Sequence, residues 1–434
     1  MRPKVTAVML FLVAVLGPAA CAGGGAKAGD GPVEVELWSW SAGFQPVVDH
    51  FNATHPDIKI RWTNAGTGED EYTKLQTALK AGRGAPDVVM LEYAELPTIQ
   101  LTKHLVDLGK YGANDLKDEY VGWAWDQVSD GDSVYAVPVD AGPMALIYRK
   151  DLFQAHGLTV PTTWAQYAEL ARQVKKVAPN SYLTDFGSND GLFVTALAWQ
   201  GGARHFTYSP SKLPNIGITI DSPETKKVLT YWEELVRGGA VDTAPYWTTD
   251  FYNGLSSGKY FSLIAASWTP DTMASVAKAT AGKWAVAPLP QWGDGKDVQA
   301  SWGGSAFAVT DQSKHPEQAA RVALELFGKD LKAWRTGIDT AYLFPTSKAV
   351  QKETYFIDHQ WPFFGGQKVN EIFRKASDGI GDYEWSPFSD YVFSQLSEQI
   401  NKAVADRSSW TAAVTTVQGK VTAHATEQGF VVNK

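Results

Sequence analysis

Residues 33–38 read VEVELW, residues 58–62 read IKIRW and residues 87–91 read DVVML. The first two stretches alternate apolar and polar residues, which predicts strands, and the third is the nearly continuous apolar run typical of a buried parallel strand. Apolar residues at helical spacing over 42–51 and 69–81 predict a helix in each gap. This βαβαβ order predicts an open parallel sheet with right-handed crossovers, and therefore an α/β fold.

The rest of the chain continues the alternation of strands and helices. Thr163 to Gln166 matches a capping box and predicts a helix start, and Ser222-Pro223 predicts another helix that ends at Gly238. Further strands are expected at 133–137, 144–148, 259–265, 284–289 and 305–309, and further helices at 315–328 and over most of 367–430. The chain has 434 residues, too many for one compact core of ordinary size, so two lobes are expected.

Composition excludes several classes of protein. Apolar residues make up 44% and charged residues 20%, which is the balance of a folded protein rather than a disordered one. The formal net charge is −8 without basic runs, which argues against a nucleic-acid partner. The single cysteine excludes an internal disulfide and a zinc site built from several cysteines.

The N-terminus has the features of a signal peptide over residues 1–20. Basic residues are followed by an apolar stretch too short to span a bilayer. Pro18-Ala19-Ala20-Cys21 resembles a lipobox, although Pro18 stands where Leu is usual, and the Gly/Ala-rich residues 21–31 predict a flexible tether. Acylation of Cys21 would anchor the protein to the outer face of the cell membrane. Simple secretion after cleavage at an A-x-A site is the alternative.

Motifs for catalysis or cofactor binding are mostly missing from the sequence. It has no phosphate-binding loop, no G-x-G-x-x-G run and no close histidine pair for a metal, so no cofactor and no metal are expected. Gly254 to Gly258 fits G-x-S-x-G, but a helix-like stretch precedes it and a strand follows, which favours the end of a helix. A carboxylate pair for glycoside hydrolysis remains open, with these candidates near the ends of elements: Glu92, Asp140, Asp190 and Asp250.

Tryptophan occurs 17 times, as often as tyrosine, and the tryptophans divide into two sets. Those at periodic positions are expected in the core (Trp62, Trp164, Trp232, Trp334), and Trp123 and Trp125 are expected to pack under a loop. Trp40, Trp268 and Trp302 lie at strand ends, where either a cleft or the core could hold them. In a cleft, their flat faces would suit the C–H face of a sugar ring.

Short segments in a characteristic order resemble the extracellular solute-binding proteins of bacterial carbohydrate ABC transporters, the maltose-binding-protein-like family. The resemblance covers essentially the whole mature chain and is carried by Leu37–Trp40, Pro56–Ile60, Gly84–Val89, Tyr135–Pro138, Leu146–Leu152, Pro161–Trp164, Gly258–Tyr260, Ser267-Trp268, Trp302–Gly304 and Phe344–Ser347. The lipobox and Phe364–Gln367 are similar to actinobacterial members.

The resemblance implies a two-lobed periplasmic-binding-protein fold of the class II type. Each lobe would hold a mostly parallel sheet flanked by helices, and hinge crossings would join the lobes. Lobe 1 would comprise 32–142 and 305–345, and lobe 2 would comprise 143–304 and 346–434. The binding residues carried over from the family are Trp40, Glu92, Tyr93, Asp140, Asn189, Trp268, Trp302, Gly303 and Gly304, with Trp361 and Trp385 as further candidates.

The function implied is capture of an oligosaccharide, without chemistry on it, for a membrane permease. Cello- or xylo-oligosaccharides are favoured because many aromatic residues suit a flat chain, and a monomer is expected. Two alternatives remain: a secreted glycoside hydrolase or esterase, and a binding protein for a non-sugar solute. A phosphorylated solute would require a basic cleft, for which the sequence offers only scattered residues such as Arg374.

Overall fold

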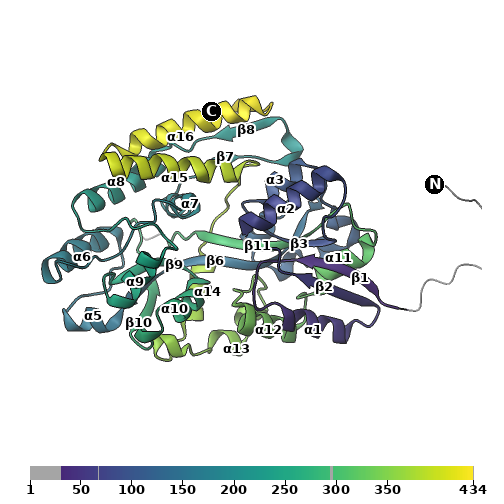
Figure 1. The fold of residues 1–434 in the computed structure, drawn as a ribbon, viewed down its shortest axis with the longest axis horizontal. Coiled ribbons are helices and arrows are strands. Elements are labelled where there is room, and N and C mark those ends of the chain that lie inside the picture. The colour runs from purple at the N-terminus through teal and green to yellow at the C-terminus, as the bar shows by residue number, and fades with distance from the viewer. Residues whose placement is uncertain (1–30, 67, 294–296, 434) are drawn as a thin grey trace, which may run out of the picture.

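The computed structural model describes residues 31–66, 68–293 and 297–433. The predicted signal peptide, Cys21 and nearly all of the predicted tether lie outside these residues. Among the residues described, no helix combines the length and the apolar character needed to cross a membrane. Figure 1 shows the strands of a large sheet running through the middle of the molecule, with helices on both sides.

The N-terminal part of the large sheet confirms the prediction from residues 33–91. Strand β1 (Val33–Trp38) pairs in parallel with β2 (Ile58–Thr63) and with β3 (Val88–Glu92). The intervening helices are α1 (Gln45–Thr54) and α2 (Gly68–Ala81). Because the apolar face of each helix packs on the sheet, the periodicity of the sequence was enough to place them.

The expectation of mostly parallel sheets does not hold for the rest of the large sheet, where the strand pairs are antiparallel, so that the sheet as a whole is mixed. Its strand order is β10-β6-β11-β3-β1-β2, and β9 also pairs with β6. The long strand β6 (Ala136–Arg149) pairs antiparallel with β9 (Ser262–Ala266), β10 (Trp284–Pro288) and β11 (Ser301–Val309), and β11 pairs antiparallel with β3. The reason is topological: the chain leaves the first lobe through β6 and returns through β11, so these two strands run in opposite directions.

Strand β6 also joins two segments that the sequence predicted as separate strands. The stretch 133–137 divides, because Ser133-Val134 forms β5 and pairs with β4 (Ser129-Asp130), whereas Ala136 already belongs to β6. The stretch 144–148 is the second half of β6. The lobe boundaries predicted at 142/143 and 304/305 therefore fall inside β6 and β11; they stay a prediction.

Helices lie around both ends of these crossing strands (Figure 1). Beside β1–β3 lie α1, α2, α3 (Leu96–Leu101), α11 (Pro316–Glu325) and α12 (Leu331–Ala341). The other α-helices are α4 (Gly122–Asp126), α5 (Lys150–Ala155), α6 (Trp164–Val177), α7 (Gly191–Gln200), α8 (Pro223–Arg237), α9 (Thr249–Ser257), α10 (Thr269–Val276), α13 (Thr354–Ile357), α14 (Val369–Asp378), α15 (Ser389–Asp406) and α16 (Trp410–Glu427). A small sheet consists of β7 (Phe206–Thr207), β8 (Asn215–Ile218) and β12 (Val431–Asn433).

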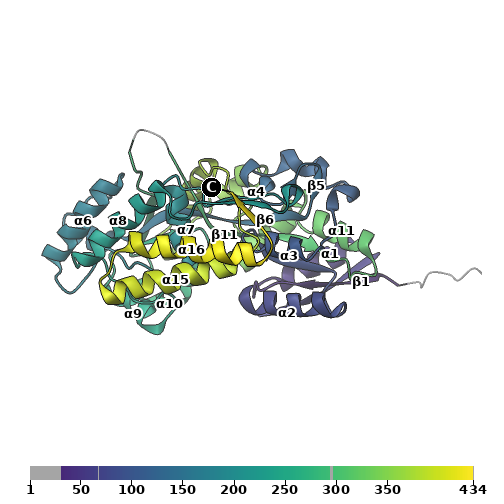
Figure 2. The same ribbon diagram turned by 90° about the horizontal axis from the view of Figure 1, so that it is seen from above.

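The predicted helix starts are confirmed at the level of hydrogen bonds. The Thr163 hydroxyl accepts from the Gln166 amide and the Gln166 side chain reaches back, which completes the capping box of α6. Ser222 caps α8 in the same position. The C-terminal helices α15 and α16 lie side by side (Figure 2) and pack against α7 and α8, respectively.

The predicted division of the tryptophans is largely confirmed for the core. Trp164, Trp232 and Trp334 are fully buried, and Trp123 and Trp125 are buried as expected. Trp62 is only half-buried at the edge of the core, and its indole N–H donates to the Ser39 hydroxyl at 2.9 Å.

Candidate functional site

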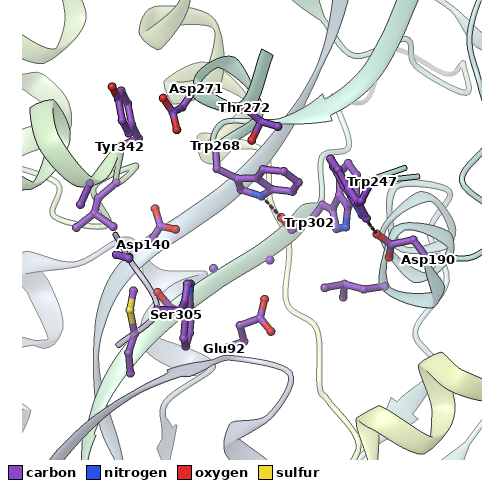
Figure 3. A pocket seen from close by; sticks show the side chains of 18 of the residues that line it. Glu92, Asp140, Asp190, Trp247, Trp268, Asp271, Thr272, Trp302, Ser305 and Tyr342 are labelled. Atoms are coloured by element: carbon purple, nitrogen blue, oxygen red, sulfur yellow. Dashed lines mark hydrogen bonds between the residues drawn. The ribbon is translucent and has the colours of Figure 1, made fainter. Parts of the chain in front are cut away.

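A cleft of about 480 Å³ opens where β3, β6 and β11 lie next to one another. Figure 3 shows aromatic rings and carboxylates facing into it. Its lining residues are Trp40, Ser41, Met90, Glu92, Asp140, Asp190, Leu192, Trp247, Tyr252, Trp268, Asp271, Thr272, Trp302, Gly303, Gly304, Ser305, Ala341, Tyr342 and Leu343. Segments that are far apart in the sequence, from Trp40 to Leu343, therefore meet at this cleft.

Three tryptophans form one wall of the cleft. The ring centroids of Trp268 and Trp302 are 5.0 Å apart, and Trp247 lies 5.5 Å from Trp268 and 5.8 Å from Trp302. Trp302 is almost buried at 3% exposure, whereas Trp247 is 36% exposed. The three rings are tilted against one another by 35° to 63°, and the indole N–H groups of Trp268 and Trp247 point toward the carbonyl of Trp302 and the carboxyl of Asp190. The cluster therefore offers the cleft the apolar faces and edges of its rings.

A glycine pair gives β11 the shape that positions this wall. The register between β11 and β6 shifts between Ser301 and Gly304, as in a β-bulge. Gly303 and Gly304 have φ values of +87° and +114°, which residues with a side chain rarely adopt. A Cβ atom on Gly304 would lie 2.7 Å from the Tyr93 ring. The bulge therefore requires glycine for its backbone and, at Gly304, also for space.

Two half-buried carboxyl groups, Glu92 and Asp140, lie on the floor of the cleft beside the tryptophans. Burial raises the pKa of Glu92 to about 7, although the Tyr72 hydroxyl, which donates to its Oε2 at 3.1 Å, opposes the shift. Burial also raises the pKa of Asp140 to about 7, against the amide of Phe344, which donates to its Oδ1 at 2.6 Å. Each carboxyl therefore accepts hydrogen bonds from the protein, and sugar hydroxyls could donate to its remaining acceptor positions.

Two more carboxyl groups line the rim, each beside an aromatic residue. Asp190 caps α7 by accepting from the amide of Phe193 at 2.8 Å, and the Trp247 indole N–H lies 3.5 Å from its other oxygen. Burial raises the pKa of Asp190. Asp271 has a pKa raised by burial, against a hydrogen bond from Tyr342, which is 41% exposed. The rim thus pairs rings for stacking with acceptors for hydroxyl groups.

Most residues predicted for the site lie at the cleft. Trp40, Glu92, Asp140, Trp268, Trp302, Gly303 and Gly304 line it. The structure places Tyr93 and Asn189 one layer behind it. Tyr93 is buried and donates its hydroxyl to the carbonyl of Asp140 at 3.1 Å. Asn189 holds the main chain of Tyr246 through both ends of its amide, at 2.8 and 3.3 Å, and so supports the loop that carries Trp247.

Several other candidates lie away from the cleft. The ring of Trp361 is 6.3 Å from that of Tyr342 and its indole N–H donates to Asn370, so it supports the rim from behind. Trp385 is buried against Trp199 and Tyr383. Asp250 is exposed in the first turn of α9 and does not line the cleft.

Sequence reasoning missed Trp247 and Tyr342 as lining residues. Trp247 directly precedes Thr248, which caps α9, and Tyr342 directly follows the last residue of α12. Both have positive φ, at 68° and 54°. A large aromatic residue just outside a helix end is a usable signal, because it falls outside the apolar stripe of the helix and is left free to project. Leu192, Tyr252, Thr272 and Leu343 carried no comparable signal.

The G-x-S-x-G match is a helix end, as its surroundings in the sequence indicated. Residues 249–257 form α9, and Gly258 ends it in the left-handed conformation at φ +81°. The Ser256 hydroxyl lies within hydrogen-bond distance of the carbonyls of Tyr252 and Val276, at 3.1 and 3.3 Å. Over the part of the chain that the structure describes, no group of three or more His, Cys, Asp or Glu could hold a metal ion.

A cleft lined by rings and carboxylates, between two α/β lobes joined by crossing strands, defines a protein that binds a small solute. The sequence pattern of the family described as bacterial extracellular solute-binding protein matches residues 38–330. The chain belongs to this family, and it has the two-lobed fold of the sugar-binding proteins of ABC transporters.

Similar proteins include two with names that state a sugar. The lactose-binding protein of Rhizobium radiobacter is 25% identical over 362 residues, 78% of this chain and 81% of that protein. The arabinooligosaccharide-binding protein of Bacillus subtilis (strain 168) is 23% identical over 414 residues, 92% of each chain.

Two solved structures share the fold at high similarity. The ABC-transporter-associated binding protein of B. animalis subsp. lactis Bl-04, in complex with β-1,6-galactobiose, has a TM-score of 0.81 and 28% identity, covering 93% of this chain and 100% of that one. The galacto-N-biose/lacto-N-biose I-binding protein of Bifidobacterium longum has a TM-score of 0.82 and 24% identity, covering 94% and 100%.

Proposed function

We propose that this protein is the substrate-binding component of an ABC importer, which captures an oligosaccharide in the cleft and delivers it to a membrane permease. One observation carries the proposal: Trp247, Trp268 and Trp302 form a single apolar wall beside the carboxyl groups of Glu92 and Asp140. A sugar ring has an apolar face and a rim of hydroxyl groups, and it needs both kinds of partner at once.

The cleft supports an uncharged solute rather than a phosphorylated one. Among the described residues that line it, four are carboxylic acids and none is lysine or arginine. An anionic ligand would meet uncompensated negative charge there. The volume of about 480 Å³ lies in the range of small-molecule sites, roughly 300–1,000 Å³, and suits a short oligosaccharide.

Cello- and xylo-oligosaccharides remain candidate ligands because a flat β-linked chain would cover the tryptophan wall. The names of the similar proteins add lactose, arabinooligosaccharides, β-1,6-galactobiose and lacto-N-biose to the candidates. A calorimetric titration against a panel of these sugars, with glucose 6-phosphate as an anionic comparison, tests the proposal. Saturable binding of at least one neutral oligosaccharide is expected, and absence of heat with the entire panel would argue strongly against a sugar.

The proposed place of action is the outer face of the cell membrane, where acylated Cys21 would tether a monomer. The test is fractionation of cells that express the full-length chain or the Cys21→Ala variant. The intact chain is expected in the membrane fraction and the variant in the medium. Release of both forms to the same extent would instead indicate simple secretion.

A glycoside hydrolase is the second candidate, because the floor of the cleft holds two carboxyl groups and the raised pKa of Glu92 is the property that a general acid requires. Members of the family named above are binding proteins, and we expect no turnover. Incubation of a bound oligosaccharide with stoichiometric protein distinguishes the two. Recovery of intact sugar supports a binding protein, and shorter products that disappear in the Glu92→Gln variant would establish a hydrolase.

A further inference from the structure

A second cavity, of about 360 Å³, lies apart from the cleft and shares no lining residue with it. Three segments form it: the start of α4, the stretch 348–352 and the C-terminal end of α14. Tyr93 lies between the two cavities, because it packs under Gly304 on one side and its ring is 6.0 Å from that of Trp123, which lines the second cavity.

The charge of the second cavity is opposite to that of the cleft. Lys348, Lys352 and Arg374 line it, and Asp378 is its one acidic residue. Asp378 already pairs with Arg374 at 2.7 Å. The Lys348 ammonium group donates to the main-chain carbonyl of Asp118 at 3.2 Å, and within the described residues neither lysine forms an ion pair. The cavity therefore carries an excess of two positive charges.

Two buried polar side chains that line this cavity have no hydrogen-bond partner among the described residues. They are the indole N–H of Trp123, on a side chain only 6% exposed, and the hydroxyl of Ser377, which is 1% exposed. An indole N–H can only donate, so its missing partner must be an acceptor. A buried donor without an acceptor is costly, and a bound acceptor would remove that cost.

The remaining walls limit the size and character of a ligand. Val121 and Ile380 are buried apolar residues on the wall, and Gln351 uses its amide N–H to hold the carbonyl of Pro345 at 2.8 Å. The unmatched groups are thus two cations and two hydrogen-bond donors. This combination is complementary to an oxyanion and not to a neutral sugar.

We propose that this second cavity binds a small oxyanion, a phosphate or carboxylate group whose oxygens accept hydrogen bonds from Trp123 and Ser377 and whose charge is balanced by Lys348 and Lys352. Arg374, the basic residue that the sequence offered only as an isolated candidate, belongs to this site rather than to the cleft. The proposal does not depend on the function proposed for the cleft, and its test needs no sugar.

The test uses protein labelled with ¹⁵N in its tryptophan indoles, titrated with sodium phosphate and, separately, with sodium glucuronate. Sodium chloride at equal ionic strength is the reference. The resonance that is missing in Trp123→Phe identifies the Trp123 indole. We expect this resonance to shift saturably with at least one of the two anions and not with chloride, and the anion that gives the tighter binding distinguishes a phosphate site from a carboxylate site.

Matched variants show whether the lysine charge acts locally. Lys352→Gln removes one positive charge at the cavity, and Lys402→Gln removes one from an exposed position on α15. We expect affinity to fall at least fivefold in Lys352→Gln and in Ser377→Ala, and to stay within twofold of the parent in Lys402→Gln. Equal losses in the two lysine variants, or an indole resonance that responds to chloride as it does to both oxyanions, would overturn the proposal.

Discussion

The indole N–H of Trp268 donates a hydrogen bond to the main-chain carbonyl oxygen of Trp302 at 2.9 Å. This bond joins the residue that precedes α10 to the bulge in β11, so the two tryptophans are fixed relative to each other before any ligand arrives (Figure 3). A wall that is already ordered loses little conformational freedom on binding, which favours affinity.

Replacing Trp268 by alanine tests this wall. We expect the affinity for the bound sugar to fall by about 1–3 kcal/mol, because a stacking surface is removed. Calorimetry gives the affinity, and thermal unfolding of the free protein gives the effect on stability. The control is Trp292→Ala, which removes a half-buried tryptophan that does not line the cleft and donates its indole N–H to Gln200. If Trp268→Ala lowers stability and leaves affinity unchanged, the residue is part of the core and not of the site.

The two glycines of the bulge should respond differently to alanine. A Cβ atom on Gly303 would meet nothing closer than 3.5 Å, so Gly303→Ala should cost only backbone strain, roughly 1–3 kcal/mol. At Gly304 the added atom would also lie 2.7 Å from the Tyr93 ring, so Gly304→Ala should cost roughly 2–6 kcal/mol through strain and overpacking together. Denaturant unfolding measures both. Equal losses would show that the contact with Tyr93 relaxes without cost.

The affinity for sugar should rise with pH across neutrality. The pKa values of Glu92 and Asp140 are both about 7 in the free cleft, so both groups are mostly protonated near pH 6 and mostly ionised near pH 8. An ionised carboxylate accepts a stronger hydrogen bond from a sugar hydroxyl than a neutral one does. Titrations at pH 6, 7 and 8 check the direction. The Glu92→Gln variant should bind sugar more weakly at pH 8, and its affinity should change less with pH. An affinity of the unsubstituted protein that does not change with pH would contradict a role of Glu92 and Asp140 as acceptors of sugar hydroxyls.

Asp185 should make the free energy of unfolding fall as pH rises. It is 1% exposed, and burial, followed by the nearby charge of Asp242, raises its pKa from 3.8 to about 8. The folded protein therefore holds a proton that the unfolded chain releases, so the stabilisation is complete below about pH 4 and is lost as pH approaches 8.

The size of this effect is roughly 2–4 kcal/mol between pH 5 and pH 8 for one such group. Buried Glu71 has a pKa of about 8 and acts in the same direction. Asp185→Asn should reduce the slope of unfolding free energy against pH, and Asp185→Asn with Glu71→Gln should reduce it further. Urea titrations at each pH measure the slope. A slope that is unchanged in both variants would mean that the two carboxyl groups are ionised in the fold.

The sequence was sufficient for elements whose pattern is local. The strands 33–38 and 58–62 and the helix that begins at Thr163 follow from periodicity and capping alone, and they lie where expected. The antiparallel pairing of β6 and β11 could not be predicted this way, because the sequence of Ala136–Arg149 does not specify which strand pairs with it. Strand pairing between distant segments is a property of the whole topology.

The same distinction applies to the cleft. Trp40, Trp268 and Trp302 could be proposed from their places at strand ends, and they line the cleft. Tyr93 has the same kind of place, directly after β3, yet it lies one layer behind because the bulge at Gly304 occupies the surface position. Whether a side chain lines the cleft or lies one layer behind it depends on how closely two backbone segments approach each other. Residue types and their spacing in the sequence do not specify that distance.

The bulge of β11 has a further consequence for kinetics. Gly303 and Gly304 lie on a strand that crosses between the lobes, whereas Trp247 and Tyr342 lie on loops at the rim. In a clamp that closes about its crossing strands, displacement grows with distance from the axis, so the floor is nearly stationary and the rim travels furthest. If this protein closes in that way on the ligand proposed for it, contacts at the floor would be available at first encounter and would govern capture, while contacts at the rim would form last and would govern how long the ligand is retained.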